Sequence, residues 1–239
     1  EHAGERRQFQ AEEDFARADL VVVNPAVPPT SRWRAFLAER RIPVCTEINL
    51  FLERCPARLV GVTGPNGKSP TAALTAGLLE SAGLKTWLGG NIGRSLLAEL
   101  PAIRAAGDAA AVVLELSSFQ LQDLARAGRS LDVSVVTNFS ENHLDYHGSM
   151  DAYRRAKQEI LRCQGSEGTA VLNADDPETG QWPARARRAG FGRAEGCDLR
   201  VVEEGLRFPE GLLVLGTTVL PGAHNRMNMA AACAAQGIV

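Results

Sequence analysis

The chain has 239 residues, of which 45% are hydrophobic and 23% are charged, and its formal net charge is −2. This composition indicates a globular protein with a full core, in one large or two modest domains, and the lack of a basic run argues against a nucleic-acid partner. The sequence has no apolar stretch of about 18 residues and no charged-then-apolar leader, so it indicates neither a membrane span nor a signal peptide. The five scattered cysteines argue against a disulfide framework or zinc site, so we expect a cytoplasmic protein.

The first part of the chain has the pattern of the end of an α/β unit. The elements expected there are a strand at 20–24, a helix from an N-cap at Ser31 to about Arg40, a strand at 42–45 and a helix at 47–54. The opening strands of this unit, with a glycine-rich ligand loop, are expected outside this sequence. We therefore predict that residues 1–54 are the tail of a Rossmann-like domain and that residues 55–239 form a central domain.

The stretch 58–71 has the pattern of a strand, a phosphate-binding loop and a helix. In the loop 64–69, Gly64 and Gly67 can turn the backbone, Lys68 supplies a charge and the Ser69 hydroxyl can reach Mg²⁺. The N–H groups of the helix that follows would face the phosphates. The general phosphate-loop pattern has a glycine where Val62 stands, so an ordinary strand-to-helix turn is the alternative.

Lysine is scarce in this chain, since only Lys68, Lys85 and Lys157 occur among its 26 basic residues. Where arginine serves as the general positive charge, a retained lysine indicates a position that needs an amine. Lys68 lies in the phosphate loop, and Lys85 opens a strand and is expected to be a solvated strand end. Lys157, inside a helix expected at 150–162, is therefore a candidate functional amine.

Two further candidates lie near the ends of apolar strands. Glu115 lies near the end of a strand expected at 110–116, and His143 lies in the loop after a strand at 133–136. Ligands of parallel sheets collect beyond the carboxyl ends of the strands, so both side chains are expected at one cleft with Lys68, as candidate metal ligands. A salt-bridged structural glutamate and a surface histidine are the alternatives. The remaining elements expected are a helix at 68–81, strands at 85–89 and 168–173, short strands around 198–220 and an alanine-rich helix that opens at 220–228.

Six stretches, taken together and in this order, resemble the motifs of the Mur ligases. They are 64–69, 114–121, 138–147, 152–157, 173–176 and 220–225. The Glu-Leu-Ser-Ser-Phe-Gln-Leu sequence at 115–121 favours the D-glutamate-adding branch of the family. The resemblance implies an α/β fold, a three-layer P-loop-like central domain with a parallel sheet.

The resemblance also implies an activity and roles for individual residues. It implies an ATP-dependent C–N ligase that joins D-glutamate to UDP-N-acetylmuramoyl-L-alanine through an acyl phosphate, with ATP and Mg²⁺ as cofactors and the monomer as the expected state. The implied catalytic residues are Lys68, Glu115, His143 and Lys157. The implied metal ligands are Ser69, Glu115, His143 and Lys157, the lysine as a carbamate. The implied ATP-binding residues are Gly64, Pro65, Asn66, Gly67, Lys68, Ser69, Pro70, Asn225 and Asn228. The implied contacts to the muramoyl-alanine part are Asn91, Ser117, Ser118 and Gln120.

The chain departs from the family pattern at several positions. Pro65 and Pro70 stand where hydroxyl residues are usual, Asn142 stands for an Asp, and Asn24 begins a variant of Ser-Pro-Gly. Pro65 removes one N–H donor from the loop. The family's loop for UDP and its C-terminal domain are expected outside this sequence. The alternatives are another Mur or folylpolyglutamate-type ligase, a generic P-loop kinase or ATPase, which would not need Lys157, and an inactive nucleotide-binding fragment.

Overall fold

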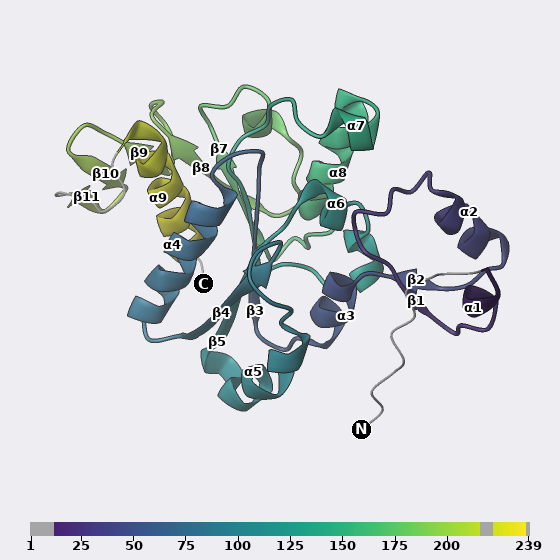
Figure 1. The fold of residues 1–239 in the computed structure, drawn as a ribbon. Helices are drawn as coiled ribbons and strands as arrows, with labels where there is room; N and C mark the ends of the chain where they lie inside the picture. The colour runs from purple at the N-terminus through teal and green to yellow at the C-terminus, as the bar shows by residue number, and fades with distance from the viewer. Residues whose placement is uncertain (1–11, 216–221, 238–239) are drawn as a thin grey trace.

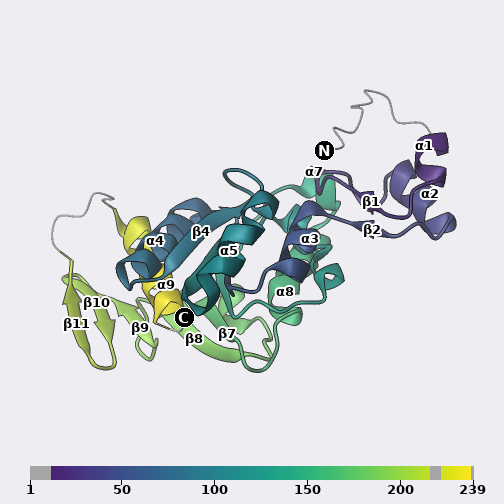
Figure 2. The ribbon, with the colours of Figure 1, turned by 90° about the horizontal axis from the view of Figure 1, so that it is seen from below.

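The computed structural model describes residues 12–215 and 222–237. Its elements form two sheets, a small one near the N-terminus and a large one that carries most of the helices. Figures 1 and 2 place the small sheet at one end of the molecule and strands β9 to β11 at the opposite end. No helix within the described ranges is long and apolar enough to cross a bilayer.

The small sheet belongs to the segment before residue 55, which we call the N-terminal segment (residues 12–54). Its elements are α1 (Glu12–Ala16), β1 (Val21–Val22), α2 (Arg32–Glu39), β2 (Val44–Cys45) and α3 (Glu47–Arg54). Strands β1 and β2 pair in parallel, with α2 as the crossover between them. The Ser31 hydroxyl accepts a hydrogen bond from the Arg34 N–H, so the predicted N-cap of this helix is confirmed.

The large sheet has nine strands in the order β11-β10-β9-β8-β7-β6-β3-β5-β4. All neighbours from β4 to β9 pair in parallel, and β10 and β11 add an antiparallel edge. The strands are β3 (Arg58–Thr63), β4 (Lys85–Gly90), β5 (Ala110–Glu115), β6 (Val133–Val136), β7 (Thr169–Asn173), β8 (Arg187–Gly192), β9 (Leu199–Val201), β10 (Gly205–Phe208) and β11 (Gly211–Val214).

Helices cover both faces of this sheet, and a hydrophobic core lies under each layer. One layer contains α4 (Lys68–Ser81) and α9 (Ala223–Gln236), which pack on each other and on the strands. The other layer contains α3, α5 (Leu100–Ala106), α6 (Ser118–Leu121) and α8 (Met150–Arg162). The shorter elements are η1 (Leu97–Glu99), η2 (Gly107–Ala109), η3 (Leu124–Ala127), α7 (Leu144–His147) and η4 (Thr179–Gln181). The predicted three-layer α/β architecture is thus confirmed.

Most of the predicted elements lie where the sequence places them, but helices α1, α5, α6 and α7 and strand β8 were not predicted. Helix α4, helix α8 and strand β6 have the predicted bounds. Strand β8 was not expected, because its sequence Arg-Arg-Ala-Gly-Phe-Gly has no apolar run, yet it continues the parallel sheet beside β7. The loop expected after β6 contains the short helix α7. Residues 220 and 221, which open the last of the six motifs, lie outside the described ranges.

Candidate active site

The loop between β3 and α4 depends on its two glycines. Gly64 and Gly67 have φ angles of 148° and 80°, which residues other than glycine rarely adopt. A Cβ atom on Gly64 would lie 2.0 Å from Thr137 Oγ1, and one on Gly67 would lie 2.4 Å from Asn228 Oδ1. The Thr137 hydroxyl in turn donates to the carbonyl of Asn66 across 2.6 Å. The loop therefore follows a tight path fixed by the strand and helix beside it.

The first turn of α4 presents a positive site. Its N-cap, Gly67, makes no side-chain capping bond, so the N–H groups at this helix end are not capped by it. Pro70 lies in the first turn, where proline is tolerated. The Lys68 ammonium is half-buried and donates to the Pro65 carbonyl across 3.1 Å. Burial lowers the pKa of Lys68, and the charge of Glu115 opposes that shift.

Glu115 lies at the end of β5, beside this helix start. Its Oε2 accepts a hydrogen bond of 2.6 Å from the Ser69 hydroxyl, and its Oε1 accepts one of 3.0 Å from Asn91 Nδ2. The Asn91 N–H also donates to the Glu115 carbonyl across 2.7 Å. Ser69 and Glu115 thus offer a hydroxyl and a carboxylate oxygen side by side, as the sequence predicts. Asn91, expected at the muramoyl-alanine part, lies against Glu115.

Lys157 projects inward from α8 and is only 2% exposed. Its Nζ donates to the Thr63 hydroxyl across 3.2 Å, at the end of β3, and lies 5.2 Å from the centre of the Tyr153 ring. Burial, and then the positive charge of Lys68, lower the pKa of Lys157 to about 7. A large fraction of this amine is therefore neutral near physiological pH.

His143 and His147 lie at the two ends of α7, next to α6. His143 is the N-cap of α7, with a φ of 51°, and its ring packs on Phe119 with centroids 4.9 Å apart. His147 Nε2 is 2.9 Å from the Ser118 hydroxyl, and burial, followed by the charges of His143 and Lys157, lowers the pKa of His147. Among the described residues, no group of three or more His, Cys, Asp or Glu side chains is placed to hold a metal.

The other predicted substrate contacts are engaged in local hydrogen bonds. Ser117 and Gln120 form a capping box at the start of α6, in which the Ser117 hydroxyl and N–H both meet Gln120 Oε1. Ser118 and Gln120 are buried. These bonds define the shape of the loop that follows β5.

A pocket of about 630 Å³ opens beside the phosphate loop, against α9. Asn228 is buried in its wall, where Oδ1 accepts from the Thr71 hydroxyl across 3.4 Å and Nδ2 donates to Asn225 Oδ1 across 3.2 Å. The structure therefore places Asn225 and Asn228, two of the implied ATP-binding residues, in the wall of the pocket beside the loop. The pocket is lined by Asn66, Gly67, Pro70, Thr137, Asn138, Asn173, Asp175, Phe191, Arg193, Ala223, His224, Asn225, Met227 and Asn228.

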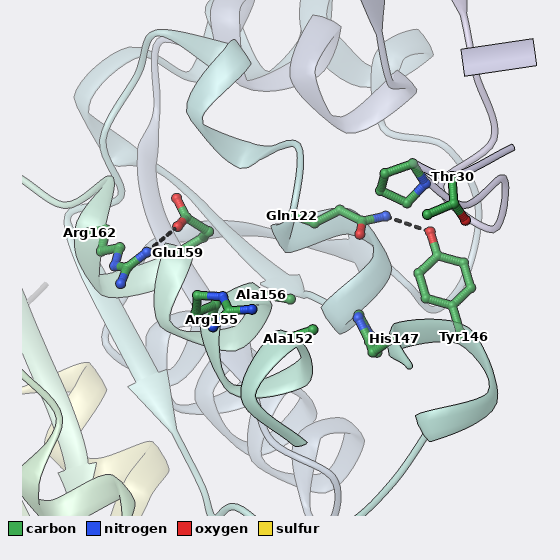
Figure 3. A pocket seen from close by; sticks show the side chains of 10 residues that line it. Thr30, Gln122, Tyr146, His147, Ala152, Arg155, Ala156, Glu159 and Arg162 are labelled. Carbon is green, nitrogen blue, oxygen red and sulfur yellow. Dashed lines mark hydrogen bonds and ion pairs between the residues drawn. The ribbon is translucent and has the colours of Figure 1, made fainter. Parts of the chain in front are cut away.

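Figure 3 shows a second, smaller hollow of about 330 Å³ between α8, α7 and the N-terminal segment. Thr30 of that segment and Arg155 of α8 are among its lining residues. Sequence patterns did not indicate this hollow, nor the residues His147 and Tyr153 near Lys157. His147 and Tyr153 do fall within the motif stretches 138–147 and 152–157, but no role was assigned to either.

Comparison with known proteins supports one family. The model of the family described as Mur ligase middle domain matches residues 62–236, which include the phosphate loop, Glu115 and Lys157. This chain belongs to the Mur ligase family. Among curated Mur ligases, the UDP-N-acetylmuramoylalanine–D-glutamate ligase of Symbiobacterium thermophilum is 39% identical over 93% of this chain and 50% of its own length. The enzyme of the same name from Acetivibrio thermocellus is 40% identical over 82% of this chain and 43% of its own length. The chain thus spans about half the length of these relatives.

Solved Mur ligase structures share the fold. A UDP-N-acetylmuramoyl-L-alanyl-D-glutamate–2,6-diaminopimelate ligase superposes with a TM-score of 0.64 at 23% identity, over 81% of this chain and 48% of its own. The MurF ligase of Thermotoga maritima, solved in complex with ADP, gives a TM-score of 0.59 at 19% identity over 92% of this chain and 62% of its own. At these identities the likeness concerns the fold alone.

Proposed function

We propose that this Mur ligase chain is the nucleotide-binding part of a cytoplasmic, monomeric enzyme of peptidoglycan synthesis. The enzyme joins D-glutamate to UDP-N-acetylmuramoyl-L-alanine at the expense of ATP, as the names of its curated relatives indicate. In this proposal residues 55–239 are the central ATP-binding domain and residues 1–54 belong to the domain for the UDP-linked substrate.

The observation that carries the proposal is the Ser69–Glu115 pair at the start of α4, with its 2.6 Å hydrogen bond. A hydroxyl and a carboxylate oxygen are ligands that Mg²⁺ prefers. If the Ser69–Glu115 hydrogen bond were replaced by a bound cation, the negative charge of the buried Glu115 would still be compensated. The residues therefore fit Mg²⁺ together with nucleotide phosphates held on the N–H groups of the loop. The bound cation would offset negative charge on the phosphates.

In the first step, a carboxylate oxygen of the UDP-linked substrate attacks the γ-phosphorus of ATP, an O–P bond forms, and ADP leaves with the electrons of the broken bond. Lys68, released from the Pro65 carbonyl, neutralises charge on the transferred phosphoryl group. In the second step, the D-glutamate amine attacks the acyl carbon and a C–N bond forms. The bond from that carbon to the phosphate oxygen breaks, phosphate leaves with its electrons, and the nitrogen gives one proton to solvent. The N–H groups of the loop hold phosphate oxygens in both steps.

Lys157 has a distinct part in this proposal. Its neutral Nζ attacks the carbon of CO₂ and gives one proton to solvent, which converts the amine to a carbamate. The pKa of about 7 supports this reaction, because only the neutral amine has the lone pair. A carbamate at this position would add two oxygens near the Thr63 hydroxyl, the kind of ligand that a second Mg²⁺ requires.

The deciding experiment is phosphate release by the full-length protein, measured with each substrate omitted in turn. Release that needs ATP, UDP-N-acetylmuramoyl-L-alanine and D-glutamate together is the expected result. Release with a different amino acid in place of D-glutamate would assign the chain to another ligase of the family. Nucleotide binding without any release would favour an inactive nucleotide-binding protein, the outcome to which the missing N–H of Pro65 points.

A further inference from the structure

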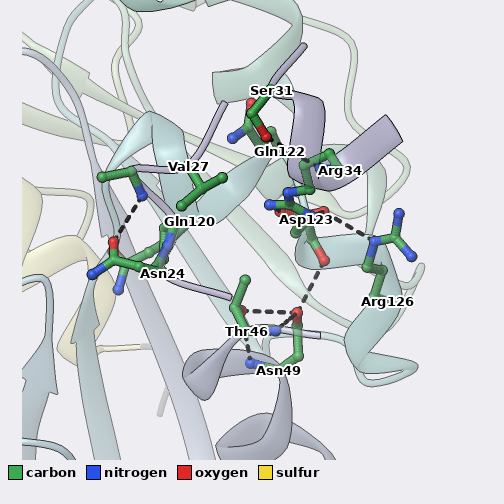
Figure 4. Close-up of polar contacts among 12 residues, drawn as sticks. Asn24, Val27, Ser31, Arg34, Thr46, Asn49, Gln120, Gln122, Asp123 and Arg126 are labelled. Atoms are coloured by element: carbon green, nitrogen blue, oxygen red, sulfur yellow. Dashed lines mark hydrogen bonds and ion pairs between the residues drawn. The ribbon is translucent and has the colours of Figure 1, made fainter. Parts of the chain in front are cut away.

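A buried ion pair joins the N-terminal segment to Asp123, which lies between the C-cap of α6 and the start of η3 (Figure 4). Asp123, which is 6% exposed, accepts hydrogen bonds of 2.6 Å and 3.3 Å from the two terminal nitrogens of Arg34 on α2. The guanidinium therefore binds the carboxylate through two hydrogen bonds, although the two residues are 89 positions apart in the sequence. Arg34 Nε is buried without a partner among the described residues. A buried ion pair that leaves one nitrogen without a hydrogen bond contributes little to stability. Stability alone therefore does not explain why Arg34 and Asp123 are paired here.

Asp123 also meets the N-terminal segment through its backbone. Its carbonyl accepts a hydrogen bond of 3.0 Å from Asn49 Nδ2 on α3, and Asn49 is itself fixed by a capping box with Thr46. A third side chain, Arg126, donates to the carboxylate across 2.9 Å but is largely exposed. Asp123 is therefore held by two different helices of the N-terminal segment, and only Arg126 comes from its own neighbourhood.

The residue before Asp123 makes a second connection to the same segment. Gln122 donates to the Tyr146 hydroxyl on α7 (Figure 3), and that hydroxyl donates to the Pro25 carbonyl across 2.8 Å. Pro25 lies in a turn closed by the Val27 N–H, which donates to the Asn24 carbonyl across 2.9 Å. The turn is thus tied to α7 and, through Gln122, to α6.

Helices α6 and α7 form one packed unit. The Ser118 hydroxyl contacts His147 Nε2, and the Phe119 ring packs on the rings of His143 and Tyr146, with centroids 4.9 Å and 4.2 Å away. This unit contains most of the residues expected to contact the muramoyl-alanine part. A displacement of the N-terminal segment would therefore be transmitted to the unit through Asp123 and Tyr146.

We propose that Asp123 is a positioning residue for the UDP-linked acceptor substrate, which it serves by holding the α6–α7 unit in register with the N-terminal segment. The inference rests on the proposed function, because it concerns the site for that substrate. Asp123 acts through Arg34 and Asn49 and, through its chain neighbour Gln122, on helix α6. The nucleotide pocket is lined by other elements, so ATP binding does not depend on Asp123.

The test is calorimetric binding of two ligands, UDP-N-acetylmuramoyl-L-alanine and Mg-ATP, to the full-length protein and to three variants. Asp123→Asn removes the charge and keeps the size. The double variant Arg34→Met, Asp123→Leu replaces the pair by apolar side chains, a change that often preserves stability. Arg126→Gln is the matched control, because it removes the exposed partner of the same carboxylate. We expect the first two variants to lose at least tenfold in affinity for the UDP-linked ligand and less than twofold for Mg-ATP, and the control to change neither.

Each other result has a defined meaning. Equal losses for both ligands, no loss for the UDP-linked ligand, or failure of both Asp123 variants to fold would overturn the positioning role. A wild-type protein that binds Mg-ATP but not the UDP-linked ligand would overturn the proposed function, and the role of Asp123 with it. A wild type that binds both ligands, with variants that bind both equally well, would refute the inference alone.

Discussion

Ser69 on the first turn of α4 donates a 2.6 Å hydrogen bond to Glu115 at the end of β5. The two residues are 46 positions apart in sequence, and β3 pairs directly with β5 in the parallel sheet. This register places the carboxylate beside the phosphate loop that follows β3. The Ser69–Glu115 pair is therefore a consequence of strand order, and it concentrates oxygen ligands where the helix end is positive.

Removal of the Glu115 charge should weaken nucleotide binding only when Mg²⁺ is present. In Glu115→Gln the hydrogen bonds to Ser69 and Asn91 can re-form, so we expect a melting temperature near that of the wild type. The affinity for ATP in Mg²⁺ should fall at least tenfold, about 1.4 kcal/mol, with no change in excess chelator. Calorimetry checks this, with the exposed Glu80→Gln on the same helix as control. An equal loss of affinity in chelator would contradict the metal role.

Two glycines of the same helix should respond in opposite ways to alanine. Gly67→Ala adds a Cβ atom 2.4 Å from Asn228 Oδ1 at a φ of 80°, so it should destabilise the protein by about 1 to 3 kcal/mol and weaken ATP binding. Gly77→Ala lies in the interior of α4 with open space around the new atom, and should stabilise by about 0.5 to 1 kcal/mol. Chemical denaturation of both variants measures the two changes. A stable Gly67→Ala protein would show that the loop can take another path.

The sequence predicts the phosphate loop and the single amine on α8 because each has a local signal. Glycines interrupt an apolar run before Lys68, and lysine is rare enough that Lys157 stands out. The parallel order of apolar strands then places Glu115 at the same edge of the sheet. These predictions needed only spacing, composition and the general behaviour of parallel sheets.

Other features of the site have no local signal. The Arg34–Asp123 pair joins two ordinary charged residues 89 positions apart, and neither lies in a distinctive pattern. The sequence indicates His143 as a candidate and gives no role to His147, whose Nε2 lies 2.9 Å from the Ser118 hydroxyl. Such partners depend on how loops pack after the sheet has formed, so they can be found only from the structure.

Restoration of a backbone donor at position 65 should tighten the binding of phosphates. Pro65→Thr adds one N–H to the loop, and a hydrogen bond to a phosphate oxygen would increase ATP affinity roughly tenfold, about 1 to 1.5 kcal/mol. Adenosine has no phosphate, so its affinity should not change, and it is the matched control ligand. Calorimetric titration with both ligands measures the difference. Equal gains for ATP and adenosine would mean that the substitution acts on the pocket and not on the phosphates.

The burial of Lys157 should make stability depend on pH in a defined window. The unfolded lysine keeps a pKa near 10.5, and burial lowers the folded pKa to about 7, so between these values only the unfolded state holds the proton. Stability rises with pH wherever the unfolded state binds more protons, so this lysine is most costly at about pH 7 and below, and the cost fades toward pH 10. In CO₂-free buffer Lys157→Met should therefore be more stable than the wild type, on the order of 3 to 5 kcal/mol at pH 7, with a smaller difference at pH 9.5.

The control variant is Lys85→Met, at a strand end, which should show no such dependence of stability on pH. Denaturation curves at several pH values measure the differences, and added bicarbonate should stabilise the wild type but not Lys157→Met, because only the lysine can form a carbamate. A difference that grew with pH would show that Lys157 is buried in its charged form.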